Sequence, residues 1–277
     1  MVRVVTESTA DIPRDMVARL GIAVVPSYVV FGKESYRDGV ELDKGQFYEK
    51  LASTRAIPTT AAPPPGVYEK VYRQLAEETD EIISIHLAAG LSALYSSAAL
   101  AASSVSEAKI VVIDSEQVSM GYGWMAVAAA EAAQQGESLD QIVALVKGMK
   151  RRSWILAVLD TLEFVHRGGR VGWVQAMVGT LLQIKPIIQV RMSEVKLLER
   201  NRTLKRSLGQ LMNLIQAMGP LERAIVLHAD APDLAEQMAD LLQTWAPGWE
   251  RLVGQAGVTV ASHAGPGAIG VACVTSN

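Results

Sequence analysis

Ser92 is a side chain with the setting for ligand or acyl chemistry. It lies in the segment GLSAL at residues 90–94, a few residues after the apolar run 82–85, where a strand is expected to give way to a helix. A hydroxyl there is close to unpaired helix N–H groups and to the positive end of the helix dipole, which favours an anion. Serine is also a preferred N-cap. The pattern therefore predicts either a helix cap or an anion-binding hydroxyl.

Thr60 and His263 lie in two other segments that could present a polar group. Thr60 is part of residues 57–66, which contain four prolines. Proline fixes φ and restricts the preceding residue, so this stiff segment either holds Thr60 for a ligand or simply connects two elements. His263 begins the run HAGPG, after an expected strand at 258–261. Its ring could donate to an anion or act as a base, whereas His86 and His228 are predicted to be structural.

A serine hydrolase is the alternative interpretation of the same residues. The segment around Ser92 matches the nucleophile-elbow pattern G-x-S-x-G except that Leu94 replaces the last glycine. His263 could serve as the base, and Asp230 or Asp233 as the acid, which gives the chain order Ser, Asp, His. An esterase-like activity that uses Ser92 and His263 therefore stays open at this point.

Two arginine clusters could bind a phosphate or a partner's carboxylates. In the first, the sequence RGGR at residues 167–170 places two guanidinium groups around two glycines, which allow close backbone approach to a ligand. In the second, Arg200 and Arg202 flank Asn201. Guanidinium groups bind such anions through two parallel hydrogen bonds. A solvated surface is the other interpretation of each cluster.

Alternating strands and helices must position these residues. Short β-branched runs, each followed by a helical pattern, occur at residues 2–6, 82–85, 110–113 and 224–227. This alternation predicts parallel α/β architecture. After residue 150 the order becomes less regular and includes an expected hairpin at 187–200. We expect an N-terminal parallel-sheet α/β domain over 1–150 and a C-terminal α+β domain over 151–277.

The composition excludes several classes of protein. Among 277 residues, 49% are hydrophobic and 20% are charged, so the chain has enough apolar material for a folded core. The formal net charge of −3 argues against a nucleic-acid partner. No metal-ligand spacing, Walker A loop or complete G-x-G-x-x-G motif occurs, and no segment has the length and apolarity of a membrane span. With the lone Cys273, this predicts a cytoplasmic protein without metal or cofactor.

The ordered set of motifs resembles the DegV family, bacterial fatty-acid-binding proteins that include the FakB-type subunits of fatty-acid kinase. The resemblance runs nearly from end to end and is carried by residues 6–13, 36–40, 58–60, 91–92, 167–170, 185–186, 200–203 and 263–267. The chain departs from the usual family residues at Ala61, Ala62, Pro64, Ala93 and Leu94.

The resemblance implies two domains with an acyl chain in a tunnel between or within them. Thr60 and Ser92 would hold the fatty-acid carboxylate, with His263 nearby. An ATP-dependent kinase subunit would phosphorylate the bound fatty acid to an acyl phosphate, and Arg170 and Arg202 would contact that partner or the phosphate. The chain itself would be a carrier without turnover, and transient contact with a membrane surface is compatible with that role.

Overall fold

The computed structural model describes residues 1–54, 57–175, 184–246 and 248–276. Four strands form a first sheet in the spatial order β2 (Ala23–Val25), β1 (Arg3–Glu7), β6 (Glu81–His86) and β7 (Lys109–Asp114). All neighbouring pairs are parallel. Parallel strands need crossover connections, and helices supply them here.

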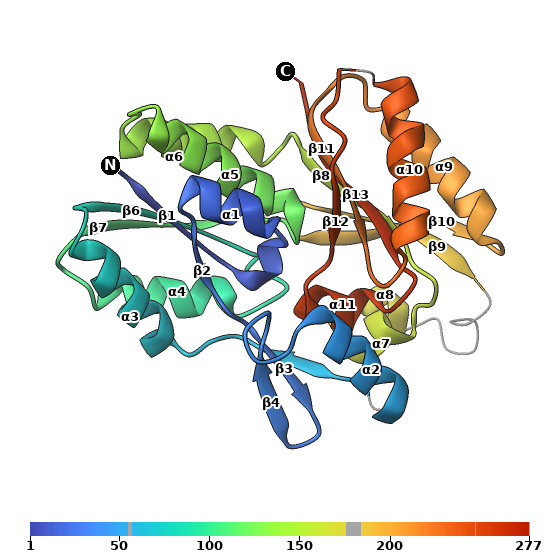
Figure 1. Cartoon of the computed structure of the whole chain (residues 1–277), viewed down its shortest axis with the longest axis horizontal. Helices are drawn as coiled ribbons and strands as arrows, with labels where there is room; N and C mark the ends of the chain where they lie inside the picture. Colours follow the sequence, from blue (N-terminus) through green and yellow to red (C-terminus); the bar gives the residue numbers. More distant parts are fainter. Residues whose placement is uncertain (55–56, 176–183, 247, 277) are drawn as a thin grey trace.

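Helices cover both faces of this parallel sheet (Figure 1). One face carries α3 (Pro65–Ala76) and α4 (Leu94–Ser103), and the other carries α1 (Arg14–Leu20), α5 (Met120–Gln134) and α6 (Leu139–Met149). A single 3-10 turn, η1 (Ser8–Ala10), follows β1. The N-terminus of α6 is fixed by a capping box in which Ser138 and Gln141 exchange hydrogen bonds.

The C-terminal half forms a six-stranded mixed sheet. Its order is β10 (Glu194–Asn201), β9 (Lys185–Arg191), β8 (Ser153–Val158), β13 (Ile269–Thr275), β11 (Leu221–His228) and β12 (Val253–Gln255). Of these pairings only that between β11 and β12 is parallel. α9 (Leu204–Gln216) and α10 (Pro232–Trp245) cover one face. The parallel α/β half and the mixed second half confirm the predicted fold class.

A small antiparallel sheet, which the sequence does not predict, joins the two halves near the lower edge in Figure 1. It contains β4 (Glu34–Arg37), β3 (Tyr28–Phe31) and β5 (Thr59–Ala61), in that order. α2 (Lys44–Thr54) follows β4. The short helices α7 (Glu163–Gly168), α8 (Gly172–Gln175) and α11 (Val258–Ala264) lie nearby, with α11 packed on α7 and β3.

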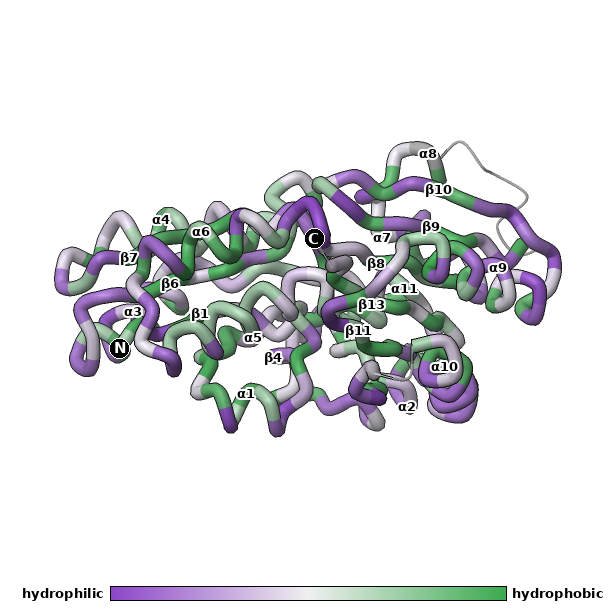
Figure 2. The backbone as a smooth tube through the Cα atoms, turned by 90° about the horizontal axis from the view of Figure 1, so that it is seen from above, coloured by the Kyte–Doolittle hydropathy of each residue, from purple (hydrophilic) through white to green (hydrophobic). Residues whose placement is uncertain are grey.

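One hydrophobic cluster connects the two large sheets. It contains Val4 and Ile83 from the parallel sheet and Ile155 and Ala272 from the mixed sheet, with α5 between them. Figure 2 shows hydrophilic turns along α10 and hydrophobic segments along β11 and β13, as expected for an outer helix and inner strands. The division into domains at residue 150 stays a prediction.

The expected strand at residues 258–261 is wrong: this segment is the first part of α11. Local β propensity is weak evidence, because tertiary contacts routinely override it. Here two carboxyl groups from the N-terminal half accept hydrogen bonds from the backbone N–H groups of Gly257 and Thr259, at the start of the helix. No helix in the described ranges is long and apolar enough to cross a membrane.

Candidate ligand-binding site

A cavity of about 220 Å³ lies on the face of the mixed sheet opposite to α9 and α10. Alternate residues of β8 show the division, because Ile155 and Ala157 line the cavity while Leu156 and Val158 pack into the core beneath α9 and α10. Successive side chains of a strand point to opposite faces, which is the reason for this alternation. The cavity therefore uses the inner face of the sheet as its floor.

Small residues lower the middle of that floor. Across four neighbouring strands, the paired residues run Ile188, Ala157, Gly270 and Leu227. All four line the cavity, and the two smallest lie between the two bulky ones. A depression crosses the sheet at Ala157 and Gly270 for this reason.

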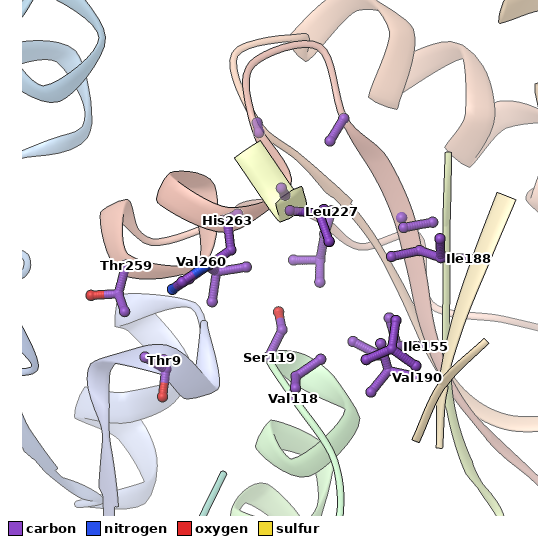
Figure 3. Close-up of a pocket in the computed structure, with 18 of the residues that line it drawn as sticks. Thr9, Val118, Ser119, Ile155, Ile188, Val190, Leu227, Thr259, Val260 and His263 are labelled. Atoms are coloured by element: carbon purple, nitrogen blue, oxygen red, sulfur yellow. The ribbon is translucent and has the colours of Figure 1, made fainter. Parts of the chain in front are cut away.

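The walls are almost entirely aliphatic. Figure 3 shows Val260 and His263 on one side of the space and Ile155, Ile188 and Val190 on the other. None of the described lining residues is Phe, Tyr or Trp. Such walls can bury an alkyl chain, but among the described lining residues they offer none of the large aromatic rings on which a nucleobase stacks best.

The three residues expected to hold the carboxylate of the ligand all line this cavity. Thr60 comes from β5, Ser92 from the loop between β6 and α4, and His263 from the last turn of α11. The structure brings Thr60 and His263 into direct contact, with Thr60 Oγ1 and His263 Nε2 2.9 Å apart. Residues that are 203 positions apart in the sequence thus share one polar corner.

His263 is a neutral group at physiological pH. Burial, and secondarily the positive charge of Arg170, lowers the pKa of its imidazole to about 4. A Cβ atom at Gly168 would lie 2.6 Å from His263 Nδ1, so only glycine leaves room for the ring in this position. The first glycine of the RGGR motif therefore accommodates His263, whereas the sequence alone indicated close approach to a ligand.

Ser92 is more loosely held than a regular N-cap. α4 begins at Leu94, two residues beyond Ser92, and Ser92 Oγ accepts a hydrogen bond from the Leu94 backbone N–H at 3.4 Å. That distance exceeds the usual range for an N–H···O bond. The hydroxyl proton of Ser92 is not used in this contact, because the oxygen is the acceptor. Ser92 can therefore both complete the helix end and donate to a ligand.

The two predicted phosphate or partner contacts occupy different positions. Arg170 is exposed, yet it lines the cavity and donates to the Gly168 carbonyl at 2.6 Å. Arg202 is exposed just after β10 and is not among the lining residues. The structure thus groups Arg170 with Thr60, Ser92 and His263 but leaves Arg202 outside.

The hydrolase arrangement is not assembled. Within the described ranges, no hydrogen bond joins His263 to Ser92, to Asp230 or to Asp233, and the Nε2 atom that would face a nucleophile is paired with Thr60. The low pKa of His263 also makes its ring a weak base. We find no activated serine in this corner.

Sequence reasoning missed a buried network behind the loop of Ser92. The Glu7 carboxylate accepts from the backbone N–H of Leu87 at 2.8 Å and from the Tyr122 hydroxyl at 2.9 Å, and it also contacts His86 Nδ1. His86 Nε2 lies 2.6 Å from Ser84 Oγ. Serine, histidine and glutamate are connected here as in a catalytic triad, but all three are fully buried and none lines the cavity. The network is structural, as predicted for His86.

Comparison with known proteins shows the family of this chain. A family model described as "Uncharacterised protein, DegV family" matches residues 1–276. The chain belongs to the DegV family. A DegV domain-containing protein of Listeria monocytogenes is 36% identical to it over 276 residues, covering 98% of this chain and 97% of the relative.

Two solved DegV structures match almost the whole chain. One is DegV, a fatty acid binding protein from Bacillus subtilis, with 34% identity and a TM-score of 0.90. The other is a DegV family protein from Thermus thermophilus described for its fatty acid binding, with 33% identity and a TM-score of 0.90. Each match covers 99% of both chains.

Proposed function

We propose that this DegV protein binds a long-chain fatty acid in the aliphatic cavity and holds its carboxylate with Thr60, Ser92 and His263. The observation that carries the proposal is the geometry of the cavity, which combines aliphatic walls with a polar corner where Thr60 and His263 meet. The fatty acid binding described for the Bacillus subtilis and Thermus thermophilus relatives supports the same ligand class.

The hydrophobic part of the ligand supplies the affinity. Burying about fourteen methylenes at roughly 0.8 kcal/mol each gives a gross ~11 kcal/mol, before the cost of immobilising the ligand. The carboxylate contributes orientation rather than strength, because an unpaired anion in an apolar site costs several kcal/mol. It must therefore be met by donors where the cavity begins.

Neutral donors suit a head group that has to react later. In the tautomer of neutral His263 that carries its proton on Nε2, the ring donates to Thr60 Oγ1, which leaves the Thr60 hydroxyl proton for the ligand. Ser92 supplies a second hydroxyl proton. A carboxylate held in this way keeps an oxygen lone pair for attack on a phosphoryl donor.

The chemistry would then belong to a second protein. We infer that this chain is a cytoplasmic carrier without turnover of its own, and that an ATP-dependent kinase subunit phosphorylates the bound fatty acid to an acyl phosphate. Arg170, at the cavity, would contact the developing phosphate, and Arg202 would contact the partner. The exposure of both guanidinium groups supports these roles.

Lipid extraction and mass spectrometry of the purified protein test the binding step. We expect one fatty acid per chain in the wild type and strongly reduced retention in Thr60→Ala and Ser92→Ala. Ser96→Ala is the matched control, since that hydroxyl is exposed on α4 and donates only to the Ala93 carbonyl. A protein that carries no lipid, and takes none up from solution, contradicts the proposal.

For the kinase step, we expect the arginine variants to behave differently from the Thr60 and Ser92 variants. Arg170→Ala and Arg202→Ala should retain the lipid but form less acyl phosphate when incubated with a fatty-acid kinase subunit and ATP. Loss of the lipid from both arginine variants would show that this division of roles is wrong.

A further inference from the structure

Asp11 joins three segments that are far apart in the sequence. It follows η1, and the residue is buried, with 9% of its surface exposed. Its Oδ1 atom accepts from the backbone N–H of Gly257 at 2.7 Å, and its Oδ2 atom accepts from the hydroxyl of Ser119. Gly257 precedes α11, and Ser119 precedes α5. One carboxyl group thus ties η1 to the first turns of two helices.

The backbone at this junction leaves little room for movement. A Cβ atom at Gly257 would lie 2.8 Å from Asp11 Oδ1, so the close contact requires glycine. Ser119 has φ 49° and ψ −145°, and Asp11 has φ 55°. Non-glycine residues adopt such conformations only where their surroundings hold them, and these positions cluster at functional sites.

A second carboxyl group supports the same helix. Asp38 Oδ2 accepts from the backbone N–H of Thr259 at 3.3 Å and from Ser8 Oγ at 3.0 Å. Ser8 belongs to η1, so both contacts bind the start of α11 to the segment that contains Asp11. The N-terminal half therefore holds α11 through two of its first backbone donors.

α11 in turn carries His263, one of the three residues proposed to hold the carboxylate. Its residues Val260, His263 and Ala264 line the cavity, as does Ser119 (Figure 3). The helix has seven residues, about 10 Å at 1.5 Å per residue, so a tilt at its first turn moves His263 relative to the rest of the site. Ser92 depends on a different support, because its loop is held by Glu7 through the N–H of Leu87.

We propose that Asp11 is a positioning residue for the head-group site: it fixes the first turn of α11 against the N-terminal half and so sets where His263 and Thr60 meet the ligand. This inference rests on the proposed fatty-acid function. Asp11 does not touch the ligand, and it acts only through the helix that it holds.

Double-mutant cycles on palmitate affinity test whether Asp11 acts through His263. We expect Asp11→Ala to weaken binding about tenfold in the wild type and about tenfold in Ser92→Ala, but less than about twofold in His263→Ala. Asp11→Asn should recover most of the lost affinity, because its amide oxygen still accepts from Gly257. Equal losses in the His263→Ala and Ser92→Ala backgrounds, or no loss at all, would overturn the proposal.

The His263 ring provides a readout that needs no ligand. In ligand-free protein at pH 7, ring nitrogen NMR shifts of His263 should change in Asp11→Ala and stay near the wild-type values in Asp11→Asn and Ser92→Ala. Unchanged ring shifts in Asp11→Ala refute the positioning role. Changed ring shifts in a protein that binds no palmitate contradict the proposed function alone.

Circular dichroism and thermal unfolding show whether each variant is folded. Should Asp11→Ala not fold, Ser119→Ala takes its place in both cycles and in the NMR measurement. It removes one of the two hydrogen bonds to Asp11 and leaves the Gly257 contact. We expect a smaller loss of affinity with the same dependence on His263, and additivity with His263→Ala would again overturn the proposal.

Discussion

His263 is held on two sides by residues that leave it no alternative position. Thr60 pairs with its Nε2 atom, and the backbone of Gly168 lies against its Nδ1 edge. An imidazole confined in this way has little entropy left to lose when a ligand binds. The position of the His263 ring therefore depends on a glycine that is not among the residues lining the cavity.

Gly168→Ala should displace the His263 ring within the partly buried corner that the ring shares with Thr60. The new Cβ atom would lie 2.6 Å from His263 Nδ1, so the ring or helix α7 must shift. We expect about a tenfold loss of fatty-acid affinity, measured by titration with palmitate. Gly172→Ala is the matched control, because its Cβ atom meets nothing within 4 Å. Equal affinities of the two variants would contradict this account of Gly168.

Stability should depend on pH through Asp11. Burial raises the pKa of Asp11 to about 7, against the hydrogen bonds from Ser119 and Gly257 and the charge of Lys44; the nearby Asp38 raises it further. The protonated form is favoured in the folded state, so its stabilisation is fully present below pH 3.8 and is lost as the pH rises through about 7.

Asp11→Asn should remove that dependence. In urea unfolding between pH 5 and 8, we expect the free energy of unfolding of the wild type to fall relative to that of the variant as the pH rises. The exposed Asp15→Asn should instead follow the wild type. Parallel pH profiles for the wild type and Asp11→Asn would show that Asp11 does not titrate in this range.

At the scale of elements, the hairpin of β9 and β10 closes the far side of the cavity. Its two-residue loop, Met192 and Ser193, has φ 52° and 61°. Tight hairpin loops with positive φ at both positions favour Asn and Gly, so this one is built from unfavourable residues. The backbone N–H of Ser193 donates to the Glu116 carbonyl at 2.8 Å, which holds the loop against the N-terminal half.

Ser193→Gly should stabilise the protein. Glycine adopts positive φ without the clash of a side chain, so we expect the free energy of unfolding to rise by about 1 kcal/mol. Ser193→Val, with a branched Cβ, should lower it. Urea denaturation at one pH measures both effects, and a less stable glycine variant would refute the assigned turn geometry.

The depression in the mixed sheet at Ala157 and Gly270 leads to a prediction about the volume that is available to the ligand. Ala157→Leu would fill the depression between Ile188 and Leu227, so we expect it to prevent palmitate binding while the protein stays folded. Ala52→Leu, on the exposed side of α2, adds the same atoms at the surface and should bind normally. Palmitate bound by Ala157→Leu with wild-type affinity would place the acyl chain elsewhere.

At the scale of the whole molecule, α5 connects the two halves of the chain that lie on either side of residue 150. It packs on strands of both large sheets, and most of its residues are buried, including Trp124, which donates to the Ala272 carbonyl at 3.2 Å. A helix that is buried on all sides has no stable position outside this interface. The halves on either side of residue 150 therefore share one core.

Unfolding should accordingly be a single transition. We expect urea curves followed by tryptophan fluorescence and by far-UV circular dichroism to coincide. Two separated transitions would instead indicate that residues 1–150 and 151–277 unfold as independent domains.

Much of the fold follows from local sequence patterns, whereas the assembly of the site follows from long-range contacts. The alternation of strands and helices along the sequence predicted the parallel sheet. The strand at β5 and the helix α11 were not predicted, because short elements gain their stability from distant partners. Thr60 and His263 lie on these two elements.

The residues behind the site gave a weaker signal. Glu7 and Asp11 lie in the polar segment at 7–11, whose only signal in the sequence is its resemblance to the family motif. Their hydrogen bonds reach residues 80 and 246 positions away, beyond any local pattern. An acidic residue at each end of a short segment after a strand was the only clue to their role.

The aliphatic cavity would also affect how long the protein survives in the cell. Occupancy by a lipid that the unfolded chain cannot bind adds RT ln(1 + [L]/Kd) to folding stability. Starved of fatty acids, the chain would open more often and be degraded sooner by proteases. Cellular abundance should then rise and fall with lipid supply, even at constant synthesis.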